Sequence, residues 1–413
     1  AAPQAPIQIR RPSTEERPLP EGIWATSAQT REQLLQNLNA LLDGKTVHFN
    51  PSDPLRMAAA AKDDAEKRKQ LERAVKVVTK GSNPELLRAR AIYFEDAPND
   101  GKLCMVFTGQ GSQYLDMGLD LAAEYPIVQA TFDEADRILT PALGKPITEF
   151  IKLAAGEDAK EKELLLRQTE YSQPATLTLD VAILRLLAAY GVYPEMVAGH
   201  SLGEYGAAVA SGIMTFEQAL LAVSARGREM ASIKIDDPGK MAGIASSADV
   251  VEEVLAEVRG YVIAANKNCP SQTVIAGASD AVDEAIERFR ARGITVYPLP
   301  VSHAFHSSIV APASEPLRAV LGRLGLQEPR RPITTNVTAE YYPTGAGAVD
   351  KIIDTLAQQV AAPVEWTAQV ERMYDDGARV FVECGPKRAL TGFIVSILKR
   401  KPHRALYTNH PKR

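Results

Sequence analysis

The chain has 413 residues, of which 45% are apolar and 24% charged. This is the composition of a globular protein with two or three folding units, and it excludes a fibre, a low-complexity chain and a disordered chain. The net charge is −4 with both signs interspersed, so we expect neither nucleic acid nor a membrane as a partner.

The cysteines Cys104, Cys269 and Cys384 are far apart and form no CxxC pair, which argues against a disulfide framework and a cysteine-based zinc site. We expect no metal. No apolar run reaches the roughly 18 residues of a membrane span, and the Pro-rich start lacks the apolar stretch of a signal peptide. We therefore expect a cytoplasmic protein, and we interpret residues 1–20 as a linker within a larger polypeptide.

The first predicted domain, residues 1–100, contains a small α/β unit over residues 20–97. The segment GIWATSA predicts a strand, and Thr30 followed by Gln33 predicts a capping box for a helix with a leucine stripe. Residues 57–80 predict a second helix, and ARAIYFE predicts another strand.

Apolar strands that alternate with amphipathic helices then predict a mostly parallel sheet with helices on both faces. LCMVF leads into the glycine-rich turn TGQGSQ, and MVAG leads into a second tight turn and a helix. Four short strands and two helices in the order βαββαβ follow, which predicts a ferredoxin-like insert, and PITTNV and RVFVEC return the chain to the first sheet. The predicted divisions are a large subdomain at 101–235 and 301–398, the insert at 236–300 and a linker at 399–413.

The segment GHSLG at 199–203 is a G-x-S-x-G motif between a predicted strand and a predicted helix. In that setting the serine lies on a strained turn that exposes its oxygen at a helix N-terminus. The motif predicts Ser201 as a nucleophile, and the alternative is an ordinary turn between a strand and a helix.

A serine nucleophile needs a base, and the chain has six histidines. Three lie in the first domain or in the last fifteen residues, outside the predicted core. His200 adjoins the serine on a tight turn, which should direct its side chain elsewhere. The segment VSHAFHS remains, so we expect His303 or His306 to be the base.

Acyl transfer also needs donors for the developing oxyanion, usually two backbone N–H groups. Leu202, directly after the nucleophile, is placed to supply one. The second is expected from Gly109-Gln110-Gly111, because flanking glycines let a backbone approach a ligand closely. The alternative for this turn is phosphate binding, which the absence of a P-loop lysine disfavours.

Arg226 is the most informative charge in the sequence. It falls on the apolar stripe of a predicted helix, together with Ala219, Val223 and Met230. A guanidinium on an inward face needs a partner. That partner is either the carboxylate of a structural ion pair or a carboxylate of the substrate, gripped bidentately.

In order and spacing, several segments resemble the malonyl-transacylase family, which includes the acyltransferase domains of type I polyketide and fatty-acid synthases. The resemblance covers residues 103–398, and residues 20–97 resemble the linker between a ketosynthase and such an acyltransferase. The segments that carry it, besides Arg226, are FTGQGSQ, QTEYSQPA, GHSLGEY, NKNCPSQTVIAG, VSHAFHS, AAPVEW and ECGPKRALTG.

The resemblance implies an α/β-hydrolase-like large subdomain with the ferredoxin-like insert. It implies a dyad of Ser201 and His306, with His306 oriented by the main-chain carbonyl of Gln359. The remaining implied roles are the oxyanion hole at Gln110 and Leu202, and substrate binding at Arg226, His200, His303 and Phe305.

The His303–His306 segment HAFH resembles the version in malonyl-preferring members, in which Phe305 would fill the space of an α-methyl group. The implied reaction moves malonyl from malonyl-CoA through a seryl ester to the phosphopantetheine thiol of an acyl carrier protein. No permanently bound cofactor is implied, and an adjacent ketosynthase is the implied neighbour. FTGQGSQYLDMG after a long linker unit favours an iterative synthase of the enediyne or polyunsaturated-fatty-acid kind. The alternatives are a serine hydrolase or thioesterase, and a non-catalytic docking domain.

Overall fold

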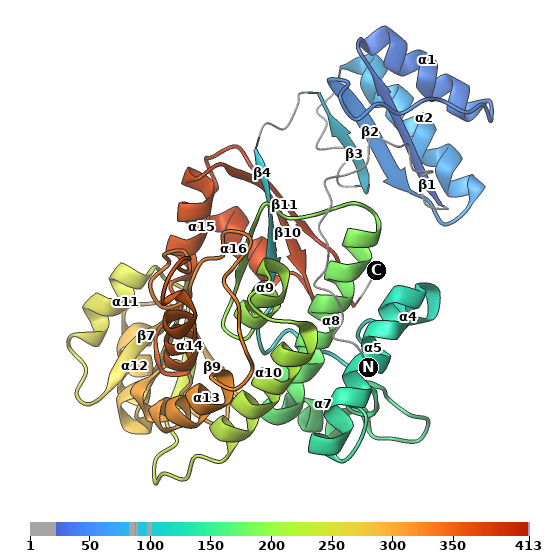
Figure 1. Cartoon of the computed structure of the whole chain (residues 1–413). Helices are drawn as coiled ribbons and strands as arrows, with labels where there is room; N and C mark the ends of the chain where they lie inside the picture. Colours follow the sequence, from blue (N-terminus) through green and yellow to red (C-terminus); the bar gives the residue numbers. More distant parts are fainter. Residues whose placement is uncertain (1–21, 82–86, 88–89, 97–100, 412–413) are drawn as a thin grey trace. The chain divides into compact units, whose positions relative to one another are not determined.

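The computed structural model describes residues 22–81, 87, 90–96 and 101–411. The chain divides into two compact units, one within residues 13–100 and one within residues 101–413 (Figure 1). The predicted linker at residues 1–20 lies outside the described residues. The two units are described separately below.

The N-terminal unit is a three-stranded antiparallel sheet in the order β1-β2-β3, with two helices. Thr30 accepts from Gln33 N and caps α1, as the sequence predicts, although the Gln33 side chain accepts from Gln29 N instead of closing the capping box. The elements are β1 (Ile23–Ala28), α1 (Arg31–Leu42), β2 (Leu55–Ala60), α2 (Asp64–Lys80) and β3 (Ile92–Glu95).

The prediction of one helix over residues 57–80 was wrong for residues 57–63. Leu55, Met57 and Ala59 are buried while their neighbours are more exposed, which is the period of a strand, and these residues form β2. The helix begins only at α2, where the Asp63 side chain accepts from Glu66 N.

The larger unit is built on a parallel four-stranded sheet in the order β11-β10-β4-β5. Strand β4 is buried on both faces: Met105 and Phe107 belong to one hydrophobic core, and Cys104 and Val106 to another. This confirms the predicted parallel sheet. The strands are β4 (Lys102–Phe107), β5 (Met196–Gly199), β10 (Ala378–Cys384) and β11 (Arg404–Tyr407).

Two differences from the sequence analysis concern this sheet. Residues 404–407, predicted to be linker, form the edge strand β11 beside β10. PITTNV contributes a single parallel bridge between Ile333 and Val197 instead of a full strand.

Helices cover both faces of the large sheet. Residues of α5, α8, α9 and α10 pack in the core that contains Met105, and residues of α15 and α16 pack in the core that contains Cys104. The helices of this unit outside the insert are α4 (Leu119–Glu124), α5 (Pro126–Leu143), α6 (Ile147–Ile151), α7 (Ala159–Arg167), α8 (Thr169–Ala189), α9 (Gly203–Ser211), α10 (Phe216–Ala231), η1 (Ser308–Ala313), α13 (Ser314–Leu321), α14 (Ala348–Gln358), η2 (Gln359–Ala361), α15 (Trp366–Asp375) and α16 (Ala389–Ile397).

The insert is a four-stranded antiparallel sheet in the order β7-β8-β6-β9, with α11 and α12 packed on a core of its own. This is the ferredoxin-like arrangement that the sequence predicts. Its elements are β6 (Lys240–Ile244), α11 (Ala248–Leu255), β7 (Val262–Cys269), β8 (Gln272–Gly277), α12 (Ser279–Ala291) and β9 (Val296–Leu299).

Cys104, Cys269 and Cys384 are free and buried. Within the described part of the chain, no helix is both long enough and apolar enough to cross a membrane.

Candidate active site

Ser201 lies on the sharp turn between β5 and α9, with a φ of 52° in the left-handed region. Glycines make this turn sterically possible. A Cβ at Gly199 would collide with the backbone of Gly203, and a Cβ at Gly203 would collide with the carbonyl of Phe107 on β4. The turn is therefore the strained elbow that G-x-S-x-G predicts, held tightly against the neighbouring strand.

His306 is the histidine that contacts the serine. Its Nε2 lies 2.6 Å from Ser201 Oγ, and its Nδ1 lies 3.1 Å from the main-chain oxygens of both Gln359 and Ala362. A carbonyl oxygen only accepts, so the ring proton belongs on Nδ1 and Nε2 is free to accept from the serine hydroxyl. Burial, reinforced by nearby Arg226, lowers the pKa of His306 to about 3, which keeps the imidazole neutral near pH 7.

Arg226 is 1% exposed on α10, whose N-terminus carries the capping box of Thr215 and Gln218. Its Nη2 lies 3.1 Å from Gln359 Oε1 and 3.5 Å from Ser201 Oγ, while its Nε has no hydrogen-bond partner. No carboxylate of the described residues forms an ion pair with it. The guanidinium is thus buried beside the serine with donor capacity left over, which is unusual unless a ligand uses it.

Gln359 connects these three residues. Its main-chain oxygen accepts from His306, and its side-chain Oε1 accepts from Arg226. Its Nε2 donates to Ser201 O at 2.6 Å and to Glu204 Oε2 at 2.8 Å. The sequence analysis expected only the main-chain contact.

Two further residues hold the elbow, and the sequence analysis missed both. Asn336 accepts from Ser201 N and donates to Gly199 O, each at 2.6 Å, so it bridges the two sides of the turn. Glu204, fully buried in the first turn of α9, accepts from the Asn336 backbone at 3.1 Å. Asn336 lies in PITTNV and Glu204 in GHSLGEY, but the spacing of these two segments in the sequence does not indicate that the two residues are in contact.

The predicted oxyanion and substrate residues Gln110 and His303 line one pocket of about 350 Å³, together with residues from α7, α8, α10 and the segment before His303. Gln110 is held there by its Nε2, which lies 3.3 Å from Thr169 Oγ1. Leu202 follows Ser201 as the first residue of the turn into α9. The two chain segments expected to supply the oxyanion donors therefore belong to the same unit as the Ser201–His306 pair.

His200 and Phe305 take different positions. The His200 ring hydrogen-bonds Asn268 at 2.8 Å and lies edge-on to Trp366. Phe305 is buried in the main core and contacts the ring of His303, with the centroids 6.3 Å apart. Phe305 therefore supports the pocket residue His303 from behind.

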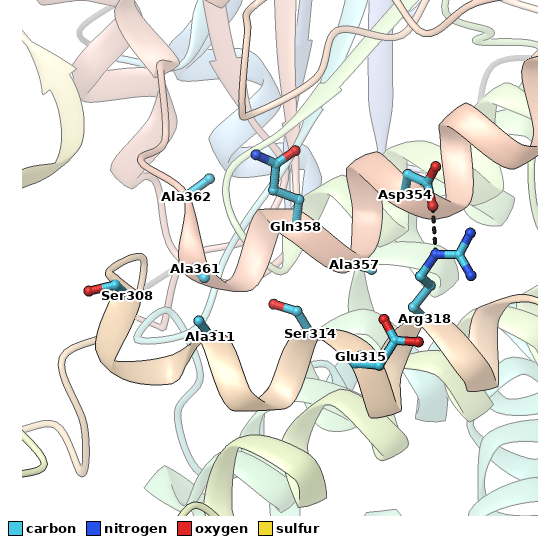
Figure 2. Close-up of a pocket in the computed structure, with 10 residues that line it drawn as sticks. All are labelled: Ser308, Ala311, Ser314, Glu315, Arg318, Asp354, Ala357, Gln358, Ala361 and Ala362. Carbon is cyan, nitrogen blue, oxygen red and sulfur yellow. Dashed lines mark hydrogen bonds and ion pairs between the residues drawn. The ribbon is translucent and has the colours of Figure 1, made fainter.

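A second pocket, of about 420 Å³, lies between the η1–α13 and α14–η2 segments (Figure 2). Ala362, whose carbonyl accepts from His306, is one of its lining residues, and an ion pair of Arg318 and Asp354 lies at its side. Neither Ser201 nor Arg226 lines this pocket or the one at Gln110 and His303, so the site is located by the hydrogen bond between Ser201 and His306 and not by a pocket.

Comparison with known proteins identifies the family of this chain. The family described as "Acyl transferase domain" matches residues 104–408. A malonyl CoA-acyl carrier protein transacylase of Bacillus subtilis is 34% identical over 304 residues, which cover 72% of this chain and 91% of that protein.

A spectinabilin polyketide synthase system protein, NorB of Streptomyces orinoci, is 32% identical over 338 residues, which cover 79% of this chain but 15% of that protein. Among solved structures, an acyl carrier protein S-malonyltransferase from Vibrio cholerae is similar with a TM-score of 0.66 and 34% identity, covering 75% of this chain and 98% of that chain.

Proposed function

The chain belongs to the acyl transferase family of malonyl-CoA:acyl carrier protein transacylases, and we propose that it carries malonyl from malonyl-CoA to a carrier-protein thiol in polyketide biosynthesis. The observation that carries this proposal is Arg226, a buried guanidinium without a carboxylate partner among the described residues, 3.5 Å from the Ser201 oxygen. An acyl group with a free carboxylate supplies the charge that this arginine lacks.

In the first half-reaction, the Ser201 oxygen attacks the thioester carbonyl carbon while His306 Nε2 takes the hydroxyl proton. The backbone N–H groups of Leu202 and Gln110 stabilise the oxyanion of the tetrahedral intermediate. Its collapse breaks the carbon–sulfur bond, and the proton on His306 passes to the departing coenzyme A thiolate. The products are a malonyl ester on Ser201 and free coenzyme A.

The second half-reaction runs the same steps in reverse with a different thiol. The phosphopantetheine thiol of the carrier protein gives its proton to His306 and its sulfur attacks the seryl ester. Collapse returns the proton to Ser201 and leaves malonyl on the carrier protein. Because Nδ1 of His306 is fixed by two carbonyls, the same Nε2 serves both half-reactions.

Arg226 gives the acyl group its orientation. A guanidinium holds a carboxylate bidentately, which presents the thioester carbon to Ser201 in one pose and leaves a defined approach for the second thiol. His303, which lines the pocket, and Phe305 behind it set the space around the α-carbon, and His200 orders the elbow from the other side. An extra methyl is discriminated by only about 1–3 kcal/mol, so the malonyl preference should be strong but not absolute.

The test is Arg226→Ala, with Arg228→Ala as the matched control because Arg228 is exposed on the same helix. Loading of Ser201 from malonyl-CoA should fall by about a hundredfold or more, at about 1.4 kcal/mol per tenfold, while acetyl loading is unchanged or improved. Intact-protein mass spectrometry with each thioester measures both. Equal losses for the two acyl groups together with a lower melting temperature would identify Arg226 as structural.

The polyketide assignment rests on the similarity to NorB and on the additional N-terminal unit. We propose that this unit is the linker to an adjacent ketosynthase, and that the synthase is iterative and cytoplasmic. The experiment is transfer of malonyl from loaded protein to polyketide and fatty-acid carrier proteins in parallel. Release of malonate to water faster than to any carrier thiol would instead identify a hydrolase.

A further inference from the structure

We propose that Glu204 is a positioning residue for acyl selection: by accepting from the Gln359 amide, it fixes the orientation in which Gln359 holds Arg226 beside Ser201. The inference rests on the proposed function, because it concerns the arginine that would bind the malonyl carboxylate.

Only one orientation of the Gln359 side-chain amide satisfies its neighbours. Its Oε1 faces the donor Arg226 Nη2, and its Nε2 faces two acceptors, Ser201 O and Glu204 Oε2. Rotating the amide by half a turn would place an NH₂ group against a guanidinium and an oxygen against a carbonyl. The hydrogen bonds from Tyr342, Gln359 and Asn336 favour the ionised form of Glu204, and a hydrogen bond to an ionised carboxylate is the stronger kind.

Only a carboxylate satisfies all donors around position 204. Oε1 accepts from the Asn336 backbone at 3.1 Å and from the Tyr342 hydroxyl at 2.7 Å, while Oε2 accepts from Gln359. A glutamine there has one acceptor atom, so its NH₂ group must face either the Asn336 N–H or the Gln359 NH₂. The backbone N–H of Asn336 cannot rotate, whereas the Gln359 side chain can. We therefore expect the Gln359 amide to turn away, so that its Oε1 no longer accepts from Arg226.

Charge reinforces the same chain of contacts. Glu204 is the carboxylate whose field acts on Arg226, although the two form no direct ion pair. In its ionised form it partly balances the guanidinium charge without a direct contact, which leaves the Arg226 donors available. Gln359 is the spacer that keeps the two apart, and a ligand carboxylate could bind without competing with a salt bridge.

The test is Glu204→Gln, with Glu383→Gln as the matched control. Both carboxyls are buried, burial raises the pKa of both to about 7, and both accept from backbone N–H groups. Glu383, however, caps α16 and has no hydrogen bond to Ser201, Arg226, Gln359 or His306 among the described contacts. The melting temperatures of the two variants should therefore decrease by similar amounts, so Glu383→Gln measures the effect of replacing a buried carboxyl with an amide outside the site.

The readout is the ratio of kcat/KM for Ser201 acylation by malonyl-CoA to that by acetyl-CoA. Glu204→Gln should lower this ratio about tenfold or more, which corresponds to about 1.4 kcal/mol, and Glu383→Gln should leave it unchanged. An unchanged ratio in Glu204→Gln would overturn the proposal even if overall activity dropped, because a merely structural residue affects both acyl groups alike.

Gln359→Met is a second test, for the case in which Glu204→Gln does not fold. It removes the bridging amide and leaves Glu204 in place. The ratio should again fall about tenfold, and an unchanged ratio would overturn the relay. When both single variants fold, the double variant should be no worse than Gln359→Met alone, because the two residues act through one contact. Failure of wild-type protein to form a malonyl ester on Ser201 would instead refute the proposed function.

Discussion

The two histidines of VSHAFHS differ in what they touch, although they are three positions apart. His306 Nε2 contacts Ser201, whereas His303 Nε2 lies 3.4 Å from the carbonyl of Ile233 and the ring lines the pocket. The first is placed to move a proton, and the second is placed to shape the space for an acyl group.

His306→Ala should therefore slow acylation of Ser201 by about 10²–10⁴-fold, the usual contribution of a general base. His303→Ala should mainly change the ratio of malonyl to methylmalonyl loading. Stopped-time mass spectrometry of the acyl-enzyme measures both, with Ser201→Ala as the unlabelled reference. The opposite pattern would show that the two roles are exchanged.

Sequence reasoning reached the residues whose chemistry is rare and missed those whose chemistry is common. Ser201 stands in a motif, and Arg226 is conspicuous as a charge on an apolar stripe. Glu204 and Asn336 look like ordinary polar residues, and their function depends on meeting across 132 positions of chain, in a hydrogen bond from the Asn336 backbone to the Glu204 side chain. No local pattern encodes such a contact.

At the level of elements, the elbow depends on close contact between α9 and β4. Gly203→Ala would insert a methyl into the carbonyl of Phe107, on a strand that cannot retreat because both its faces are packed. We expect a loss of about 3 kcal/mol or more, or failure to fold, because backbone and not a flexible side chain opposes the methyl.

Gly392→Ala is the control for that substitution. Gly392 is exposed in α16, and a Cβ there would meet no atom within 4 Å. Alanine should stabilise this helix by about 0.5–1 kcal/mol. The melting temperatures of the two variants should therefore shift in opposite directions. A melting temperature of Gly203→Ala equal to that of the wild type would show that α9 and β4 can move apart to accommodate a methyl group.

Strands were predicted correctly where an apolar run was bounded by turns. They were missed where the residues were assigned to a helix or to a linker. MVAG became β5 with the predicted limits, and the βαββαβ insert appeared in order. The residues MAAA at 57–60 were predicted as the start of a helix, yet their alternating burial places them in β2. β11 was missed because its four residues carry no period of their own and are ordered by pairing with β10.

In the molecule as a whole, the proposed site draws on distant parts of one unit. Residues from the β4–α4 loop, the elbow, α10, the segment before η1 and the segment around η2 all belong to it. Their sequence order gives no distances, and only the parallel sheet brings the ends of β4 and β5 together. The fold class and the Ser201–His306 pair were therefore predictable, whereas the side-chain hydrogen bonds of Gln359, Glu204 and Asn336 were not.

The edge strand β11 provides the last prediction, because the sequence analysis took it for linker. It covers the free side of β10, and the residues after it make further contacts: Thr408 N donates to Glu383 O at 3.1 Å, and Asn409 accepts from the Tyr114 hydroxyl at 2.6 Å. Tyr114 follows the Gly109–Gly111 turn that we expect to hold the oxyanion. Ending the chain at residue 403 should therefore remove several hydrogen bonds of about 1 kcal/mol each and expose a strand edge.

The shortened protein should melt several degrees lower than the full chain, since about 1 kcal/mol corresponds to about 2–4 °C in a domain of this size or somewhat smaller. It should also aggregate more readily and form the malonyl ester more slowly, because the oxyanion turn loses its support from Asn409. Asn409→Ala separates the two effects, since it removes the contact to Tyr114 and leaves β11 paired with β10. A shortened chain that melts and acylates like the full one would show that residues 404–413 are linker after all.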